Sequence, residues 1–213
     1  MTVARRPARP RLTRRRRARA WRAALAIALA AGSAGGCGGS GDDADTARAA
    51  APRSTPSGFA AASAGRVTLA HPSGWLPVEP PEGWPFAAEL RDGSRVHARV
   101  GVIRAVPRPS DADADAGVVA AAVDTALRLT VTRYDRGPRR DLRVPGARDA
   151  VRVDYTYLDG PGAGEPAKGT DVVLVYGRGE SAVVRITGRP ATLPPAVVDQ
   201  IVGTVTVVPG PGG

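Results

Sequence analysis

The chain has little of what metal sites and covalent crosslinks are built from. Its 213 residues include one cysteine and two histidines. A single cysteine has no partner within the chain, so an intrachain disulfide is excluded. One thiol and two imidazoles also fall short of the ligand set that a structural zinc site uses. We therefore expect no metal site.

Motifs of catalysis and of cofactor binding are missing as well. The sequence contains no G-x-S-x-G, HExxH, C-x-x-C or phosphate-loop pattern. Aspartates alternate through residues 111–115 as in a calcium loop, but Ala116 and Ala122 stand where that loop needs glycine and glutamate. The glycines of residues 160–164 are not followed by the last glycine of a dinucleotide loop. We expect helix-start acids and a plain surface loop, with no cofactor.

The two histidines are the remaining candidates for acid–base chemistry. His71 could act as a general base with Asp154 or Asp171. A histidine that precedes a proline at the end of a strand is, however, typical of a turn. We therefore expect neither His71 nor His97 to be catalytic, and the sequence predicts a protein that is not an enzyme.

Positive charge is concentrated at the start of the chain. Ten arginines lie within residues 5–22, and residues 1–36 contain no acidic residue. Because the whole chain has 30 basic and 20 acidic residues, residues 37–213 have 20 of each. A neutral remainder does not favour binding to phosphate backbones. We expect no nucleic-acid partner.

The first 37 residues have the layout of a secretory signal peptide. The arginines are followed by a small, apolar run over residues 23–34, which is shorter than the roughly 20 residues of a membrane-spanning helix. The small residues before Cys37 resemble the lipobox of bacterial lipoproteins, although Ala34 stands where that family prefers leucine. We expect cleavage between Gly36 and Cys37, and lipidation of Cys37, with acyl chains such as palmitate as the anchor.

This layout predicts where in the cell the protein is located. The lipidated Cys37 would hold the protein on the outer face of the cytoplasmic membrane. An ordinary secreted protein with an incidental thiol is the alternative. Arg14 and Arg15 suggest the twin-arginine export route, but the aromatic residue or leucine expected shortly after that pair is missing, which favours export by the Sec route.

Composition divides the chain into four parts. Residues 1–36 are the expected signal peptide, and residues 37–65 are a tether rich in Gly, Ala, Pro and Ser with Phe59 as its one large apolar side chain. Such a composition has too little to bury to offset the entropy of ordering. Residues 66–208 have the length of one domain, and residues 209–213 are an expected disordered tail.

Hydrophobic periodicity predicts an α+β fold. Alternating or continuously apolar runs indicate strands, and a three- and four-residue repeat indicates two helices, the second capped by Thr192. Hairpin connections predict a mainly antiparallel sheet with the helices packed on it, an α/β/α sandwich. The expected strands span residues 66–70, 86–90, 95–106, 139–144, 150–158, 171–176, 181–187 and 205–208, and the expected helices span residues 111–129 and 192–203.

This order resembles the PsbP-like α/β/α sandwich, in particular the actinobacterial LpqN-type lipoproteins. The resemblance rests on residues 71–75 (HPSGW) after the first strand, on the helix between the two halves of the sheet, and on residues 197–207 at the end. It covers roughly residues 66–208. The resemblance implies an envelope-associated accessory or interaction protein without a shared catalytic set.

Aromatic residues are scarce, at 4% of the chain, so the few large ones are candidates for recognition. Amphipathic rings supply much of a typical binding surface. We take Trp75, Trp84, Tyr155 and Tyr157 as a possible binding face. The alternative is that the tryptophans cover the sheet edge and the tyrosines fill the margin of the core.

The function predicted from these features is a membrane-anchored, non-enzymatic accessory module of the bacterial cell envelope. Its partner would be an envelope protein, the cell wall or a lipid. One alternative is a lipid or small-ligand carrier, which requires a deep apolar cavity. Another is an envelope hydrolase that uses Ser73 or Ser181 with a histidine.

Overall fold

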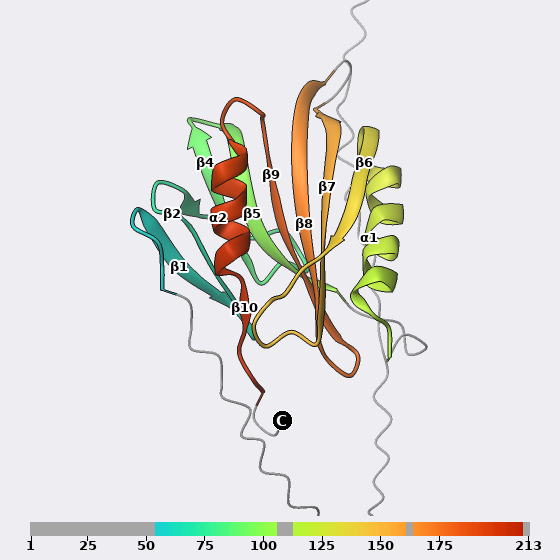
Figure 1. Ribbon diagram of the computed structural model, residues 1–213. Helices are drawn as coiled ribbons and strands as arrows, with labels where there is room; N and C mark the ends of the chain where they lie inside the picture. Colours follow the sequence, from blue (N-terminus) through green and yellow to red (C-terminus); the bar gives the residue numbers. More distant parts are fainter. Residues whose placement is uncertain (1–53, 106–112, 161–163, 211–213) are drawn as a thin grey trace, which may run out of the picture. The chain divides into compact units, whose positions relative to one another are not determined.

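The computed structural model describes residues 54–105, 113–160 and 164–210. The predicted signal peptide, Cys37 and the predicted tail beyond residue 210 lie outside the described residues. Within them the chain forms a seven-stranded sheet, a three-stranded sheet and two helices (Figure 1). Neither of these helices is both long enough and apolar enough to cross a membrane.

The large sheet is antiparallel throughout, with the strand order β3-β4-β5-β9-β8-β7-β6. Its long central strands follow the alternating pattern seen in the sequence. The predicted α+β fold is confirmed. The strands are β3 (Leu76–Pro77), β4 (Phe86–Asp92), β5 (Arg95–Ala105), β6 (Thr132–Asp141), β7 (Asp149–Asp159), β8 (Glu165–Gly177) and β9 (Glu180–Gly188).

The small sheet consists of β1 (Phe59–Ala64), β2 (Val67–Pro72) and β10 (Thr206–Val207), in the order β1-β2-β10. The prediction of a tether over residues 37–65 is therefore wrong for residues 59–64. The alanines of β1 have little to bury, but the strand pairs with β2 along its whole length through backbone hydrogen bonds. Such pairing depends on the partner strand and leaves no trace in side-chain composition.

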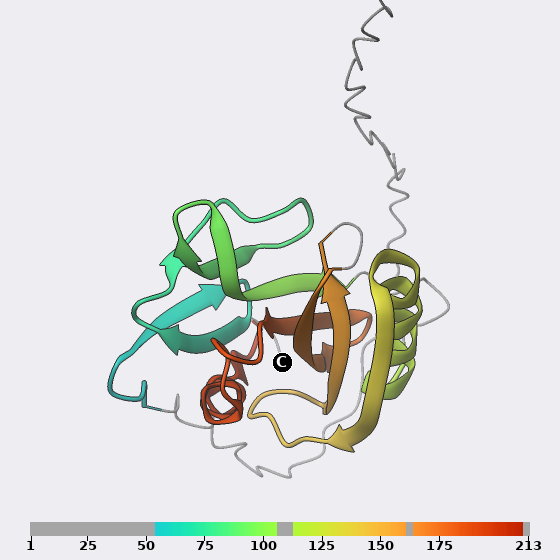
Figure 2. The same cartoon turned by 90° about the horizontal axis from the view of Figure 1, so that it is seen from above.

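The two faces of the large sheet are covered by different elements (Figure 2). On one face Val100, Val172 and Val184 join a core with β2, β10 and α2 (Pro195–Thr204). On the other, Val153 and Val173 pack against α1 (Ala116–Thr130). We call these the α2 side and the α1 side of the sheet.

The helix starts depend on capping. Asp115 is the N-cap of α1, and its carboxylate accepts the Val118 N–H at 2.8 Å, so the helix begins five residues later than expected. The predicted cap of the second helix is wrong. Pro194 occupies that position without a side-chain hydrogen bond, and the Thr192 hydroxyl instead donates to the carbonyl of His97 at 3.0 Å.

Two strands begin earlier than the sequence predicted. β6 begins at Thr132, seven residues before the expected position. Hydrophobic periodicity did not reveal its first residues, because β6 is an exposed edge strand without an apolar face. Its pairing with β7 is shifted at two places, one of which encloses Gly137 and Pro138. β8 begins at Glu165, and its first residues are polar or small, so the segment 159–169 resembled a loop.

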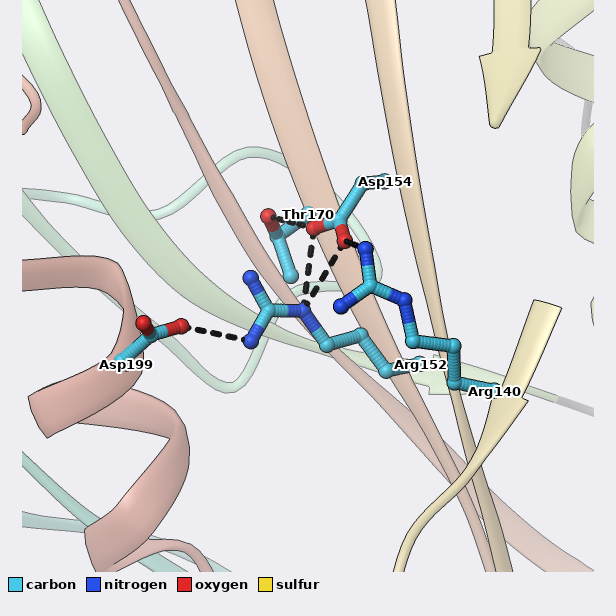
Figure 3. A network of polar contacts seen from close by, with 5 residues as sticks. All are labelled: Arg140, Arg152, Asp154, Thr170 and Asp199. Atoms are coloured by element: carbon cyan, nitrogen blue, oxygen red, sulfur yellow. Dashed lines mark hydrogen bonds and ion pairs between the residues drawn. The ribbon is translucent and has the colours of Figure 1, made fainter. Parts of the chain in front are cut away.

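One arginine ties α2 to the large sheet. Arg152 on β7 donates from Nη1 to Asp199 of α2 at 2.7 Å and from Nε to Asp154 at 3.0 Å (Figure 3). Asp154 also accepts the hydroxyl of Thr170 on β8 at 2.6 Å. This network fixes the position of α2 across the sheet.

Candidate functional site

The four aromatic residues predicted as a binding face do not all lie on one side of the sheet. Trp75 is buried in the core of the α2 side. Trp84 lies on the α1 side, where it covers Gly101 of β5; a Cβ on that glycine would be 2.4 Å from the indole ring. Tyr155 and Tyr157 are on the α1 side too, since they alternate with the residues of the other core along β7. The structure thus brings three of the four to the same side.

Charged residues that the sequence analysis did not select lie beside these aromatics. The strand register places Glu89, Arg99, Thr187 and Gly169 in one row that ends at Tyr155. Arg185 and Asp171 occupy the neighbouring row. We define the arginine–tyrosine face as Arg91, Arg99, Arg185, Tyr155 and Tyr157, together with the carboxylates Glu89 and Asp171 beneath them.

The first carboxylate, Asp171, forms a bidentate ion pair with Arg185. Arg185 donates from Nε to Oδ1 at 2.9 Å and from Nη2 to Oδ2 at 2.7 Å. The Tyr155 hydroxyl donates to Oδ1 at 3.3 Å. Burial acts to lower the pKa of Arg185, but the hydrogen bonds and charge of Asp171 outweigh it and raise that pKa. Arg185 therefore remains a cation in a largely enclosed position.

The second carboxylate, Glu89, is also enclosed by guanidinium groups. Its side chain is 1% exposed, while those of Arg91 and Arg99, which both bind it, are 41% and 34% exposed. The negative groups thus lie inside and the positive groups outside. This order gives the face a positive potential toward solvent, although its ion pairs are locally balanced.

The tyrosines form a row along the same face. The ring centroid of Tyr155 is 5.4 Å from that of Tyr134 and 6.0 Å from that of Tyr157. Burial, and next to it the charge of Asp171, raises the pKa of Tyr155; burial and the charge of Asp159 raise the pKa of Tyr157. Both phenols are therefore neutral at physiological pH; Tyr157 is half-buried, whereas Tyr155 is buried and its hydroxyl is already bound to Asp171.

Gly169 makes room for this row. It lies opposite Tyr155 on the neighbouring strand, and a Cβ there would be 2.2 Å from Cζ of the ring. A glycine that faces an aromatic residue across two strands allows the ring to lie on the backbone. The sequence shows both residues, but only the register of β7 and β8 brings them together.

For the hydrolase alternative, among the described residues, His71 Nδ1 contacts the carbonyl of Pro72, not Ser73, and Ser181 lies far from His97. Ser181 pairs with Ala105 at one end of the β5–β9 ladder, whereas His97 lies just beyond the Ala98–Gly188 pair at the other end. The seven residue steps from position 181 to position 188 span about 23 Å. His71 lies on β2, with its ring against Phe86 and Nδ1 3.0 Å from the carbonyl of Pro72.

The side chains that could bind a metal ion are not clustered among the described residues either. Across residues 54–105, 113–160 and 164–210, no three side chains of the His, Cys, Asp or Glu type are close enough to hold an ion. Asp115, one of the aspartates spaced as in a calcium loop, is used as a helix cap. Cys37, the predicted lipidation site, lies outside the described residues.

Comparisons with known proteins give the fold. No family model matches the chain, and no curated protein matches it. Among solved structures, it is similar to LpqN of Mycobacterium tuberculosis, which is involved in cell envelope biogenesis, with a TM-score of 0.50 and 12% identity over 67% of this chain and 83% of that one. This likeness confirms the fold that the sequence resemblance implied.

Two further structures are similar at a lower level. Cyanobacterial PsbP from Synechocystis has a TM-score of 0.48 and 15% identity, over 81% of this chain and 98% of that one. The Ran-binding protein Mog1p of Saccharomyces cerevisiae also has a TM-score of 0.48, with 13% identity, over 70% of this chain and 95% of that one.

Proposed function

We propose that this chain is an exported lipoprotein of the bacterial cell envelope whose folded domain docks a protein partner and catalyses no reaction. The arginine–tyrosine face is the docking surface. The observation that carries the proposal is the burial difference across that face: Glu89 is enclosed, whereas the side chains of Arg91 and Arg99 that bind it are 41% and 34% exposed, and Tyr157 is half-buried beside them. The fold shared with LpqN, a protein involved in cell envelope biogenesis, supports the location.

The anchor is Cys37. An arginine-rich leader and a short apolar run precede it, and small residues surround it. A diacylated thiol with a further acyl chain holds a protein on a membrane, because each buried methylene contributes about 0.8 kcal/mol and one chain alone binds only marginally. The leader thereby gives the domain its place at the outer face of the cytoplasmic membrane.

The chemistry of the face favours an acidic segment of a partner protein. Arginine and tyrosine are enriched among the residues that dominate binding energy at interfaces. Arg91 and Arg99 already have a common carboxylate partner in Glu89, so they are held in place before a partner arrives. A preorganised guanidinium loses less entropy when it binds a carboxylate. Tyr157 adds a hydroxyl and an aromatic edge beside them.

The same contacts argue against catalysis at this face. Asp171 and Glu89 are each neutralised by guanidinium groups at hydrogen-bonding distance. Both oxygens of each carboxylate are occupied by guanidinium groups, so neither carboxylate is placed to accept a proton from a substrate. The groups are arranged for structure and recognition.

The anchor is tested by metabolic labelling with an alkynyl fatty acid. The native chain should be labelled and found in the membrane fraction, whereas Cys37→Ala should be unlabelled. Ser40→Ala, a change just after the predicted cleavage site, is the matched control and should be labelled like the native chain. A native chain that stays unlabelled, or equal labelling of Cys37→Ala, would refute lipid anchoring.

The docking surface is tested by photocrosslinking in cells. Tyr157 and Tyr176 are both half-buried tyrosines, but Tyr176 belongs to the α2 side of the sheet. Azidophenylalanine at position 157 should give a discrete adduct with one protein, and the yield should fall in high salt because the contact is electrostatic. Azidophenylalanine at position 176 should not. Equal adducts at both positions, or none at position 157, would contradict the docking surface while leaving the anchor untouched.

A further inference from the structure

A cavity of about 390 Å³ lies beside α2 and strands β6, β7 and β8, and Tyr155 and Gly169 are among the residues that line it. Pro195 and Val198 of α2 form one wall, Thr156 and Lys168 line it from β7 and β8, and Asp135 of β6 lies at its rim. Its volume is within the range of about 300–1,000 Å³ that small-molecule sites occupy. The cavity is thus large enough for a small organic ligand.

Two charged groups of this cavity, Arg152 and Asp154, are already neutralised by ion pairs. Arg152 is bound to Asp154 and Asp199, and Asp154 also accepts Thr170 and lies 3.3 Å from Arg140 (Figure 3). A ligand that displaced any of these contacts would leave a charge without its partner. The network therefore forms a fixed wall.

Lys168 differs from these groups. It is half-buried and lines the cavity, yet none of the described side chains forms an ion pair or hydrogen bond with it. The strand register places it directly opposite Thr156, two residues before Thr170 on the same side of β8. Lys168 is also the one lysine of a chain with 30 basic residues. It supplies an ammonium group that is free to bind a ligand.

We propose that this cavity binds a small organic monocarboxylate, with the carboxylate on Lys168 and an apolar body against Pro195 and Val198. A charged hydrogen bond to an ammonium is among the stronger polar contacts available to a ligand. A dianion is disfavoured, because Asp135 and Asp154 also line the cavity. The proposal is tested separately from the docking proposal, because Lys168, Pro195 and Val198 are not part of the arginine–tyrosine face.

The single lysine allows a direct test on the full chain with hexanoate as the probe. Reductive methylation with ¹³C-formaldehyde labels Lys168 and the terminal amine, and the signal missing from Lys168→Met identifies the lysine. Hexanoate should shift that signal saturably. 1-Hexanol, with the same apolar chain and no charge, should not.

Calorimetry on the unmodified chain gives the second measurement. Lys168→Met should weaken hexanoate binding by about tenfold or more, the usual effect of losing a charged hydrogen bond. Lys168→Arg should bind hexanoate within about threefold of the native chain, because it retains the cation. Arg178→Met, at an exposed position, is the matched charge control and should bind as the native chain does.

Three outcomes would overturn the proposal. They are an equal shift with 1-hexanol, a shift that does not saturate, and unchanged affinity for hexanoate in Lys168→Met. A melting curve shows whether Lys168→Met folds. If it does not fold, the methyl signal of the native chain still tests the first two outcomes. None of these results bears on adducts at position 157.

Discussion

Asp171 and Arg185 face each other across β8 and β9, and both carboxylate oxygens accept hydrogen bonds from the one guanidinium. The Asp171 side chain is 3% exposed and that of Arg185 is 17% exposed. Such a pair stabilises a fold mainly by being complete, because its two charges have left water together. Substituting only one partner of the pair should therefore lower the stability of the fold strongly.

We expect Asp171→Asn to lower the free energy of unfolding by about 3–5 kcal/mol, since it leaves the Arg185 cation enclosed without a counter-charge. The double change Asp171→Leu with Arg185→Met should cost much less. Urea unfolding of Asp171→Leu, Arg185→Met and the double variant measures the coupling in a double-mutant cycle, with Asp171→Asn measured beside them. A single change that costs under about 1 kcal/mol would place the pair among ordinary surface ion pairs.

All four tyrosines should titrate late in the folded protein. Burial, in each case the largest cause, raises the pKa of Tyr134, Tyr155, Tyr157 and Tyr176 above the usual 10.0. Above pH 10 the unfolded chain has lost phenolic protons that the folded chain keeps, so stability should fall as the pH rises. Absorbance at 295 nm should show phenolate appearing together with unfolding. Phenolate formation near pH 10 in a chain that is still folded would contradict this.

Asp124 should contribute stability at neutral pH that is lost in acid. Burial acts to raise its pKa, but hydrogen bonds from Tyr134 and Arg128 and the arginine charges hold it below 3.8. A carboxyl with a depressed pKa stabilises the fold fully above its unfolded value, and this contribution fades as the pH falls through the folded value. The difference in unfolding free energy between the native chain and Asp124→Asn should therefore shrink below pH 3.8.

Tyr134→Phe provides the control for that measurement. It removes the 2.7 Å hydrogen bond to Asp124 and leaves the arginines in place. It should reduce the acid-sensitive part of the stability without abolishing it. If Asp124→Asn and the native chain keep a constant difference down to pH 2, the hydrogen bonds do not favour the charged form.

Two glycines should respond to alanine in opposite directions. Gly169→Ala places a Cβ 2.2 Å from the Tyr155 ring and should lower the melting temperature and disturb the tyrosine row. Gly203→Ala in α2 meets no atom within 4 Å and should raise stability by about 0.5–1 kcal/mol, the usual gain of alanine over glycine in a helix. Calorimetry and near-ultraviolet circular dichroism measure both effects. Equal losses would show that the contact at Gly169 is unimportant.

The sequence predicted best the elements whose side chains enter a core. The alternation in β5 and β7 predicted both strands within a residue of their ends, because one face of each is apolar and the other is not. β1 and the first half of β6 were missed for the opposite reason. Their pairing is held by backbone hydrogen bonds, and neither has an apolar face that a periodicity could reveal.

The candidate site was predictable only in part. The alternation along β7 placed Tyr155 and Tyr157 on one side of the sheet. Trp75 and Trp84 lie outside any segment with hydrophobic periodicity, so the sequence could not show that they are on opposite sides of the sheet. Arg99 lies opposite Glu89 because the strand register shifts between Leu90 and Arg91, which the sequence did not predict. The burial of Glu89 depends on how arginines fold over it, which is a property of the tertiary structure.

The borders of the large sheet affect whether copies of this protein can join edge to edge. β3 at one border has two residues, and β6 at the other has Pro138, two register shifts and charges of both signs. Such borders offer a poor template for a neighbouring strand. Under the proposed lipid anchor, molecules would be concentrated in one leaflet and would collide far more often than in solution. A sheet that ends in this way would allow them to crowd there without joining into fibrils.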